Sequence, residues 1–198
     1  MTRIPVRERV SLPLLTGLVV LWLLLWGDVS WANVLSGLAV GLLATLVLPL
    51  PALRAPVRLR PLRVLALLAR FAVDLVRASA QVAWLAVRPG QQPRNSVVGV
   101  PLHSGSDLFV AATAQLTSLV PGSVIVEIGP RPGEEQPVWI YVHALGVADP
   151  AARDRARAAV RATERRVVRA LATRDALASY EERCRAADVA DRREEASR

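Results

Sequence analysis

The chain has 198 residues, of which 53% are hydrophobic, and its formal net charge is +8. Its one cysteine, Cys184, excludes an intrachain disulfide framework and a cysteine-based metal site. The basic charge raises the question of nucleic acid, but the arginines gather beside long apolar stretches and no aromatic-interleaved basic motif occurs, so we expect a membrane protein with no nucleic-acid partner.

Two charge-free stretches, residues 10–27 and 29–53, lie near the N-terminus. Stretches of this length indicate transmembrane helices, here at about 12–27 and 31–48 of a hairpin that occupies residues 1–52. A cleaved signal peptide is the alternative for the first stretch, but a second apolar segment follows almost at once and favours the hairpin.

Basic residues flank the hairpin on both outer sides, at Arg3, Arg7, Arg9, Arg54, Arg58, Arg60 and Arg63. Because basic residues beside spans mark the cytoplasmic side, both ends of the hairpin are expected to be cytoplasmic. The same arginines favour anionic lipid headgroups.

Small and polar residues recur every fourth position in the second stretch, at Asn33, Gly37, Gly41 and Thr45. They share one helical face, and the two glycines form a GxxxG pair of the kind that lets helix backbones approach closely in lipid. This face is predicted to pack against another helix, either the first span of the same chain or a span of another subunit.

A third helix is expected at about 62–87, within a basic and membrane-associated segment at 53–88. Polar residues form a stripe along it, at Arg70, Asp74, Arg77 and Gln81. Each charge at a span's centre costs about 2.5–3.5 kcal/mol, whereas the helix's Leu, Val and Phe side chains together return roughly 3–7 kcal/mol. The helix therefore lies at the interface with its charges in water, which leaves the rest of the chain cytoplasmic, or spans with the stripe buried against partner proteins and Asp74 paired with Arg70 or Arg77.

After a Pro- and Gly-containing linker at 89–95, residues 96–172 alternate between strand and helix patterns. The pattern predicts strands at 96–102, 123–128 and 138–144, a helix that begins at Ser106 and stops at Pro121-Gly122, and a helix capped by Asp149. The order is β-α-β-β-α, a small α+β domain with both helices on one sheet face. Residues 173–198 are expected to form a polar helical or disordered tail.

Spacing also predicts which side chains are buried in this domain. On the first helix the apolar face is Leu108, Ala112, Gln115 or Leu116, and Leu119. On the second strand, Val124, Val126 and Ile128 point one way, and Ser123, Ile125 and Glu127 point the other. The sheet face away from the helices is a candidate docking face of Glu127, Trp139, Tyr141 and His143, unless headgroups, the third helix or the C-terminal extension covers it.

No catalytic, cofactor-binding or metal-binding constellation is found. His103 and His143 stand at unrelated places, and the chain has no Ser/His/Asp order, HExxH, P-loop or dinucleotide fingerprint. Two classes remain open: a membrane-anchored protein-interaction domain, and a membrane-bound enzyme that uses His143 with Glu127 or Glu134.

The hairpin, the charged third helix and two short segments resemble the E subunit of the multisubunit Na+/H+ antiporters, the Mrp or Mnh complexes. The specific residues are Leu116, Thr117, Pro121, Gly122, Tyr141 and His143. The resemblance covers about residues 10–175. The family usually has Thr before the Pro-Gly pair, where this chain has Val120.

The resemblance implies an accessory subunit of a hetero-oligomeric antiporter in a bacterial plasma membrane, which exchanges Na+ or other monovalent cations for protons. It implies a role in assembly and ion transport, other antiporter subunits and the lipid bilayer as partners, and no cofactor. Our hypothesis is that the Gly37/Gly41 face and the Arg70/Asp74/Arg77 stripe meet partner helices.

Overall fold

The computed structural model describes residues 12–47, 57–58, 60–89, 94–130 and 137–196, in two compact units of residues 1–54 and 55–198. Five residues singled out from the sequence fall outside the described ranges, namely Arg3, Arg7, Arg9, Arg54 and Glu134.

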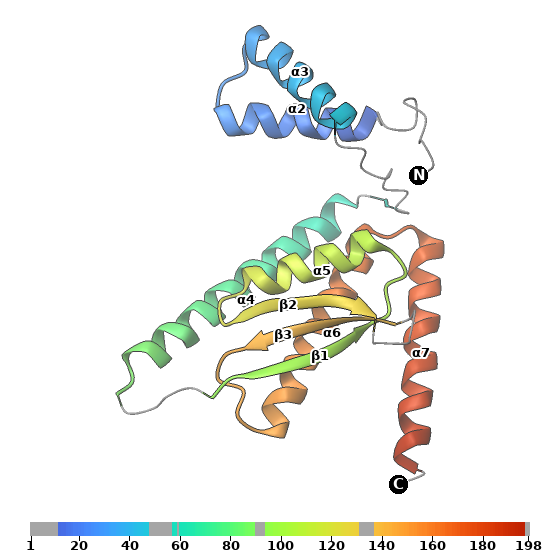
Figure 1. Ribbon diagram of the computed structural model, residues 1–198. Helices are drawn as coiled ribbons and strands as arrows, with labels where there is room; N and C mark the ends of the chain where they lie inside the picture. Colours follow the sequence, from blue (N-terminus) through green and yellow to red (C-terminus); the bar gives the residue numbers. More distant parts are fainter. Residues whose placement is uncertain (1–11, 48–56, 59, 90–93, 131–136, 197–198) are drawn as a thin grey trace. The chain divides into compact units, whose positions relative to one another are not determined.

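The first unit is a pair of packed helices, α2 (Leu12–Trp26) and α3 (Trp31–Val47) (Figure 1). Gly27 ends α2 with a φ of +70°, a conformation that glycine adopts without steric cost. Ser30 then caps α3, because its hydroxyl oxygen accepts from the backbone N–H of Asn33 at 3.2 Å. Within the described ranges, no helix reaches both the length and the apolar character needed to cross a membrane.

The second unit contains a three-stranded antiparallel sheet and the remaining described helices. Its elements are α4 (Pro61–Val87), β1 (Ser96–Leu102), α5 (Asp107–Leu119), β2 (Ser123–Pro130), β3 (Val138–Ala144), α6 (Pro150–Leu171) and α7 (Arg174–Ala196). The strand order is β1-β3-β2. The predicted β-α-β-β-α order is confirmed, and the tail after residue 173 continues as a helix to Ala196.

Turn and capping chemistry explains where these elements begin and end. Gly122 has a φ of +89° and reverses the chain between α5 and β2. Its carbonyl accepts from the Leu145 N–H at 2.8 Å, which ties that turn to the end of β3. Asp149 caps α6 through its side-chain oxygen, which accepts from the Ala152 N–H at 2.6 Å, with Pro150 at the first helical position.

One sheet face packs against α5 and α6 to form the main core. The core consists of Val98, Val100, Leu102, Val110, Ile140, Val142, Ala144, Val147 and Val160. A second cluster joins α5, α6 and α7 around Phe109, Val167, Val168, Ala172 and Tyr180. The domain is thus a sheet covered on one side by two helices, with α7 docked through the second cluster.

The predicted buried face of α5 is wrong in part: Ala112 and Leu116 do pack against the second core cluster, but the fully buried residues are others. The buried residues are Phe109, Val110, Thr113, Ala114 and Thr117. The helix lies between the two core clusters, so it buries the side that carries Phe109 and Val110, while Leu119 is 54% exposed. Thr117 tolerates burial because its hydroxyl donates to the Thr113 carbonyl at 2.7 Å.

The predicted alternation of β2 is also wrong, because a register shift interrupts the strand between Ile125 and Glu127. Val124 pairs with His143 and Glu127 pairs with Tyr141, so both point to the outer sheet face. Ile128 pairs with the buried Ile140, on the same side as Ile125. A bulge adds one residue to a strand and so inverts the alternation that follows it.

Candidate functional site

In the hairpin unit, the small-residue face of α3 lies against α2. Gly37, Gly41 and Thr45 are its buried residues. A Cβ atom built on Gly37 would lie 2.9 Å from Cδ1 of Trp22, and one on Gly41 would lie 3.1 Å from Cδ1 of Leu15. The glycines therefore allow the close approach of α2 of the same chain, rather than facing away from it.

Hydrogen bonds also connect residues of the hairpin at this interface. Trp22 donates its indole N–H to the Ser36 hydroxyl at 3.2 Å, across the two helices. Asn33 donates its side-chain amide to the carbonyl and carboxylate of Asp28, at 3.2 and 3.3 Å, in the connecting turn. Trp22 and Trp26 contact one another, with ring centroids 5.9 Å apart.

In the second unit, α4 docks on α6 through backbone and charged contacts. The Arg58 N–H donates to the Leu171 carbonyl at 2.7 Å, and Val57 bridges Ala172. Further along, the Arg63 guanidinium donates to the Arg169 carbonyl at 3.2 Å. Together these contacts fix the start of α4 against the end of α6.

The polar stripe of α4 faces the chain's own domain. Asp74 lies 3.2 Å from Arg70 and 2.8 Å from Arg166 of α6. Its side chain is 28% exposed, which places the pair at a half-buried helix interface. Asp74, Arg77 and Gln81 line one wall of a cavity of about 560 Å³. The opposite wall is the inner face of the sheet. The alternatives drawn from the sequence, water or a partner helix, did not include this α6 contact.

We expect Asp74→Asn to lower the stability of the second unit by about 1 kcal/mol, because it removes the charge that holds Arg166 to α4. Thermal unfolding of the full chain in mild detergent measures the loss. Asp154→Asn is the matched control, since among the described residues Asp154 pairs with Arg157 alone, at 3.2 Å, and its side chain is 71% exposed. Equal midpoints for the two variants would show that the α4–α6 ion pair contributes nothing.

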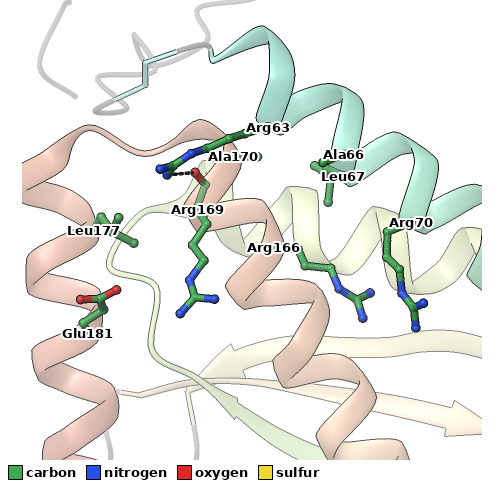
Figure 2. Close-up of a pocket in the computed structure, with 9 residues that line it drawn as sticks. All are labelled: Arg63, Ala66, Leu67, Arg70, Arg166, Arg169, Ala170, Leu177 and Glu181. Carbon is green, nitrogen blue, oxygen red and sulfur yellow. Dashed lines mark hydrogen bonds between the residues drawn. The ribbon is translucent and has the colours of Figure 1, made fainter.

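Next to this ion pair, α4, α6 and α7 enclose an arginine-lined groove of about 520 Å³ (Figure 2). Its charged lining is Arg63, Arg70, Arg166, Arg169 and Glu181. A second hollow of about 710 Å³ adjoins it and shares Arg63 and Glu181. That hollow adds Arg58, Arg60 and Arg174. We refer to the two hollows together as the arginine groove.

Glu164 is a buried charge that sequence reasoning missed. It is 1% exposed, and one of its carboxylate oxygens accepts from the backbone N–H groups of His103 and Ser104, both at 2.7 Å. The Tyr180 hydroxyl donates to the other oxygen at 3.4 Å. The carboxylate therefore joins α6 to the end of β1 and to α7. The apolar 3–4 spacing of α6 gave no signal for it, since a charged residue breaks that pattern.

The surroundings of this carboxylate shift two neighbouring groups. Burial, and then the Glu164 charge, raise the pKa of the Tyr180 phenol above its ordinary range, so it remains a donor. Burial also raises the pKa of the Cys184 thiol. A thiol with a raised pKa carries little thiolate at neutral pH, which makes Cys184 a poor nucleophile.

The residues that carry the family resemblance lie mainly at the α5–β2 turn. The Ser123 hydroxyl donates to the Thr117 carbonyl at 2.7 Å, and Val120 ends α5 with an extended backbone. Leu116 packs against the second core cluster, and Pro121 and Gly122 make the reversal. Their evident role in this structure is to stop a helix and start a strand.

Tyr141 and His143 belong to β3 and point to the outer sheet face, together with Trp139 and, across the strand, Glu127. Gly99 on β1 leaves room for the two aromatic rings, since its added Cβ would lie 3.2 Å from Tyr141 and 3.4 Å from Trp139. Within the described ranges, no cluster of three His, Cys, Asp or Glu side chains is placed to hold a metal ion.

These features describe a class of protein: an apolar helical hairpin followed by a small α+β domain to which a charged helix is docked. A family model described as "Na+/H+ ion antiporter subunit", MNHE, matches residues 15–170. The chain belongs to this family and is a subunit of a multisubunit Na+/H+ antiporter. Membership places it at a membrane, with other antiporter subunits as partners.

Two solved structures are similar to the chain. One is the Mrp complex from Dietzia sp. DQ12-45-1b, at 29% identity and a TM-score of 0.42, over 56% of this chain and 97% of that one. The other is the membrane-bound sulfane sulfur reductase, an archaeal respiratory membrane complex, at 20% identity and a TM-score of 0.55, over 73% and 87%. The second likeness shows a shared fold. A comparison with curated proteins found no match.

Proposed function

We propose that this subunit is a membrane-anchored accessory protein that supports antiporter assembly, with its α+β domain on the cytoplasmic side of a bacterial plasma membrane. One observation carries the membrane anchor. Outside their mutual contact, α2 and α3 expose large apolar side chains, including Leu24 at 75%, Leu25 at 78% and Leu35 at 63%. An apolar surface of this extent needs lipid or protein around it.

The lengths of the helices bear on how the hairpin would sit in lipid. Within the described residues α2 has 15 residues and α3 has 17, so these helical segments are about 22 and 25 Å long, while a typical hydrocarbon core is about 30 Å thick. Short spans are accommodated by local thinning of the bilayer, by flanking residues or by association with other helices. Association suits a subunit that works inside a complex.

The orientation follows from the distribution of charge. Arginines occur before the first apolar stretch and after the second. The only charged residue between the two stretches is Asp28. Under the positive-inside rule, both outer ends face the cytoplasm. If α4 stays at the interface, docked on α6, the domain that follows it is cytoplasmic as well.

An assembly role suits the residues better than an enzymatic one. His143 has Val97 and Val124 as its cross-strand neighbours on the outer face, not a base or a nucleophile. The buried carboxylate of Glu164 is occupied by backbone donors rather than directed at a substrate. We therefore assign the chain no catalytic residues.

The outer sheet face is our proposed contact surface for another antiporter subunit. Val97 and Val124, each 58% exposed, flank the half-buried Trp139, Tyr141 and His143 on it. Aromatic rings among exposed valines are typical of the apolar centre of a protein interface.

Purification of the tagged full chain from native membranes in mild detergent tests the proposal. We expect the antiporter's larger multi-span subunits to be recovered with it, and Val97→Asp/Val124→Asp to reduce that recovery several-fold. Val189→Asp, at an exposed position of α7, is the control and should change nothing. Recovery of the chain alone would refute the assembly role, and full recovery with the double variant would refute this contact surface.

A further inference from the structure

The arginine groove gathers positive charge from three segments that are far apart in the sequence. Figure 2 shows Arg63 and Arg70 on α4, and Arg166 and Arg169 on α6, around one hollow, with α7 closing it through Leu177 and Glu181. The adjoining hollow brings in Arg58, Arg60 and Arg174. The sequence alone groups only those arginines that follow the hairpin.

The carboxylates that the structure describes do not balance this charge. Asp74 pairs with Arg70 and Arg166, so one carboxylate serves two guanidinium groups. Within the described ranges, no ion pair reaches the other five arginines of the groove, although Glu181 lines it. Holding several like charges together is unfavourable unless an anion joins them.

The arginines also act on one another. Desolvation, and then the charges of Arg63, Arg58 and Arg174, lower the pKa of the Arg60 guanidinium from its ordinary value. A guanidinium nevertheless stays protonated at neutral pH, so the repulsion persists until an anion binds.

The groove has an apolar floor as well as a charged rim. Ala66 and Leu67 of α4, Ala170 of α6 and Leu177 of α7 line it between the arginines. Leu67 and Leu177 pack against the second core cluster, so the floor is built on a rigid part of the domain. A ligand with an anionic head and an apolar body matches both surfaces.

We propose that the arginine groove binds the phosphate group of an anionic ligand, and that an anionic phospholipid supplies it. A guanidinium group can form bidentate hydrogen bonds to two phosphate oxygens. Several guanidinium groups at one site therefore favour an anionic headgroup over a zwitterionic one. Family membership places the chain at a membrane, where anionic headgroups are available. This inference goes beyond the assembly role, because it assigns a ligand to the arginine groove.

Binding is tested with the purified full chain in an uncharged detergent. Short-chain phosphatidylglycerol, matched phosphatidylcholine and inorganic phosphate are titrated separately, with thermophoresis and the thermal unfolding midpoint as readouts. We expect phosphatidylglycerol to bind about tenfold more tightly than phosphatidylcholine, and Arg63→Gln/Arg169→Gln to weaken it by about tenfold. The Arg63→Lys/Arg169→Lys variant keeps the positive charge but loses the two-pronged guanidinium hydrogen bonds. Its affinity for phosphatidylglycerol should therefore lie between that of the unmodified chain and that of the Arg63→Gln/Arg169→Gln variant.

Arg153→Gln/Arg192→Gln removes the same charge from exposed positions of α6 and α7 outside the groove, and should leave affinity within about twofold. If inorganic phosphate binds as tightly as phosphatidylglycerol and competes with it, the phosphate site stands and its ligand is a soluble anion. If the groove variant binds phosphatidylglycerol like the unmodified chain, or if phosphatidylglycerol and phosphatidylcholine bind equally, the proposal is overturned. This experiment measures lipid affinity, whereas the co-purification experiment measures assembly. The lipid-binding proposal can therefore be refuted while the assembly role stands, and the reverse.

Discussion

Replacement of Glu164 by Ala is expected to lower the free energy of unfolding of the second unit by about 3 kcal/mol. The carboxylate accepts from two backbone N–H groups at the end of β1, both at 2.7 Å, and is 1% exposed. Its removal leaves both donors without that acceptor, and each orphaned donor costs about 1–3 kcal/mol. Thermal or urea unfolding of the full chain in mild detergent, followed by circular dichroism, measures the effect.

Glu164→Gln keeps an oxygen acceptor and loses the charge, so its loss of stability should be about half as large. Glu182→Ala removes the same side chain from an exposed position of α7 and should leave stability unchanged. If Glu164→Ala unfolds at the same midpoint as Glu182→Ala, the carboxylate does not hold the β1 end and the described role of this residue is wrong.

The second large effect is expected in the hairpin, from Gly37→Leu/Gly41→Leu. The added side chains would occupy the positions of Trp22 and Leu15, which lie within about 3 Å of a Cβ at those sites. Close packing is what associates helices in lipid, so α2 and α3 should separate by about 3 Å and antiporter recovery should fall several-fold. Spin labels on Leu21 and Leu38, with Cys184 replaced by Ala, report the separation in lipid nanodiscs.

Gly17→Leu is the matched control. Gly17 lies on α2 with nothing within 4 Å of its added Cβ, so the substitution adds the same side chain without a clash. The interhelical distance and the recovered complex should both match the unmodified chain. An unchanged distance in the Gly37→Leu/Gly41→Leu variant would mean that this face does not set the hairpin packing.

The sequence predicted those elements whose signals are local. Charge-free runs, Gly122 after Pro121, and Asp149 before Pro150 each act within a few residues, and the structure begins and ends helices and strands close to those positions. Strands β1 and β3 have the predicted bounds. Local steric and capping rules are enough for such boundaries.

The errors arose where distant segments decide the outcome. Two faces of α5 carry apolar residues at helical spacing, and the choice between them depends on the two core clusters between which the helix lies. The bulge in β2 depends on its pairing with β3. Neither piece of information is present in a single helix or strand.

The charged sites were predicted in part for the same reason. The sequence singled out Asp74 and Arg70 because they are four residues apart. The shorter contact of Asp74, however, is with Arg166 on α6, which follows all three strands in the sequence. Nothing in the neighbouring sequence indicated that Glu164 is buried or that the α6 and α7 arginines line the groove. Charged residues on a helix are normally expected to face solvent.

In the proposed membrane anchor, lipid surrounds residues 12–47. The direct measurement is alkaline carbonate extraction of membranes from cells that express the full chain without the other antiporter subunits. We predict that the chain stays in the membrane pellet and that only detergent releases it. Recovery of the chain in the carbonate supernatant, soluble and monodisperse without detergent, would contradict the membrane anchor.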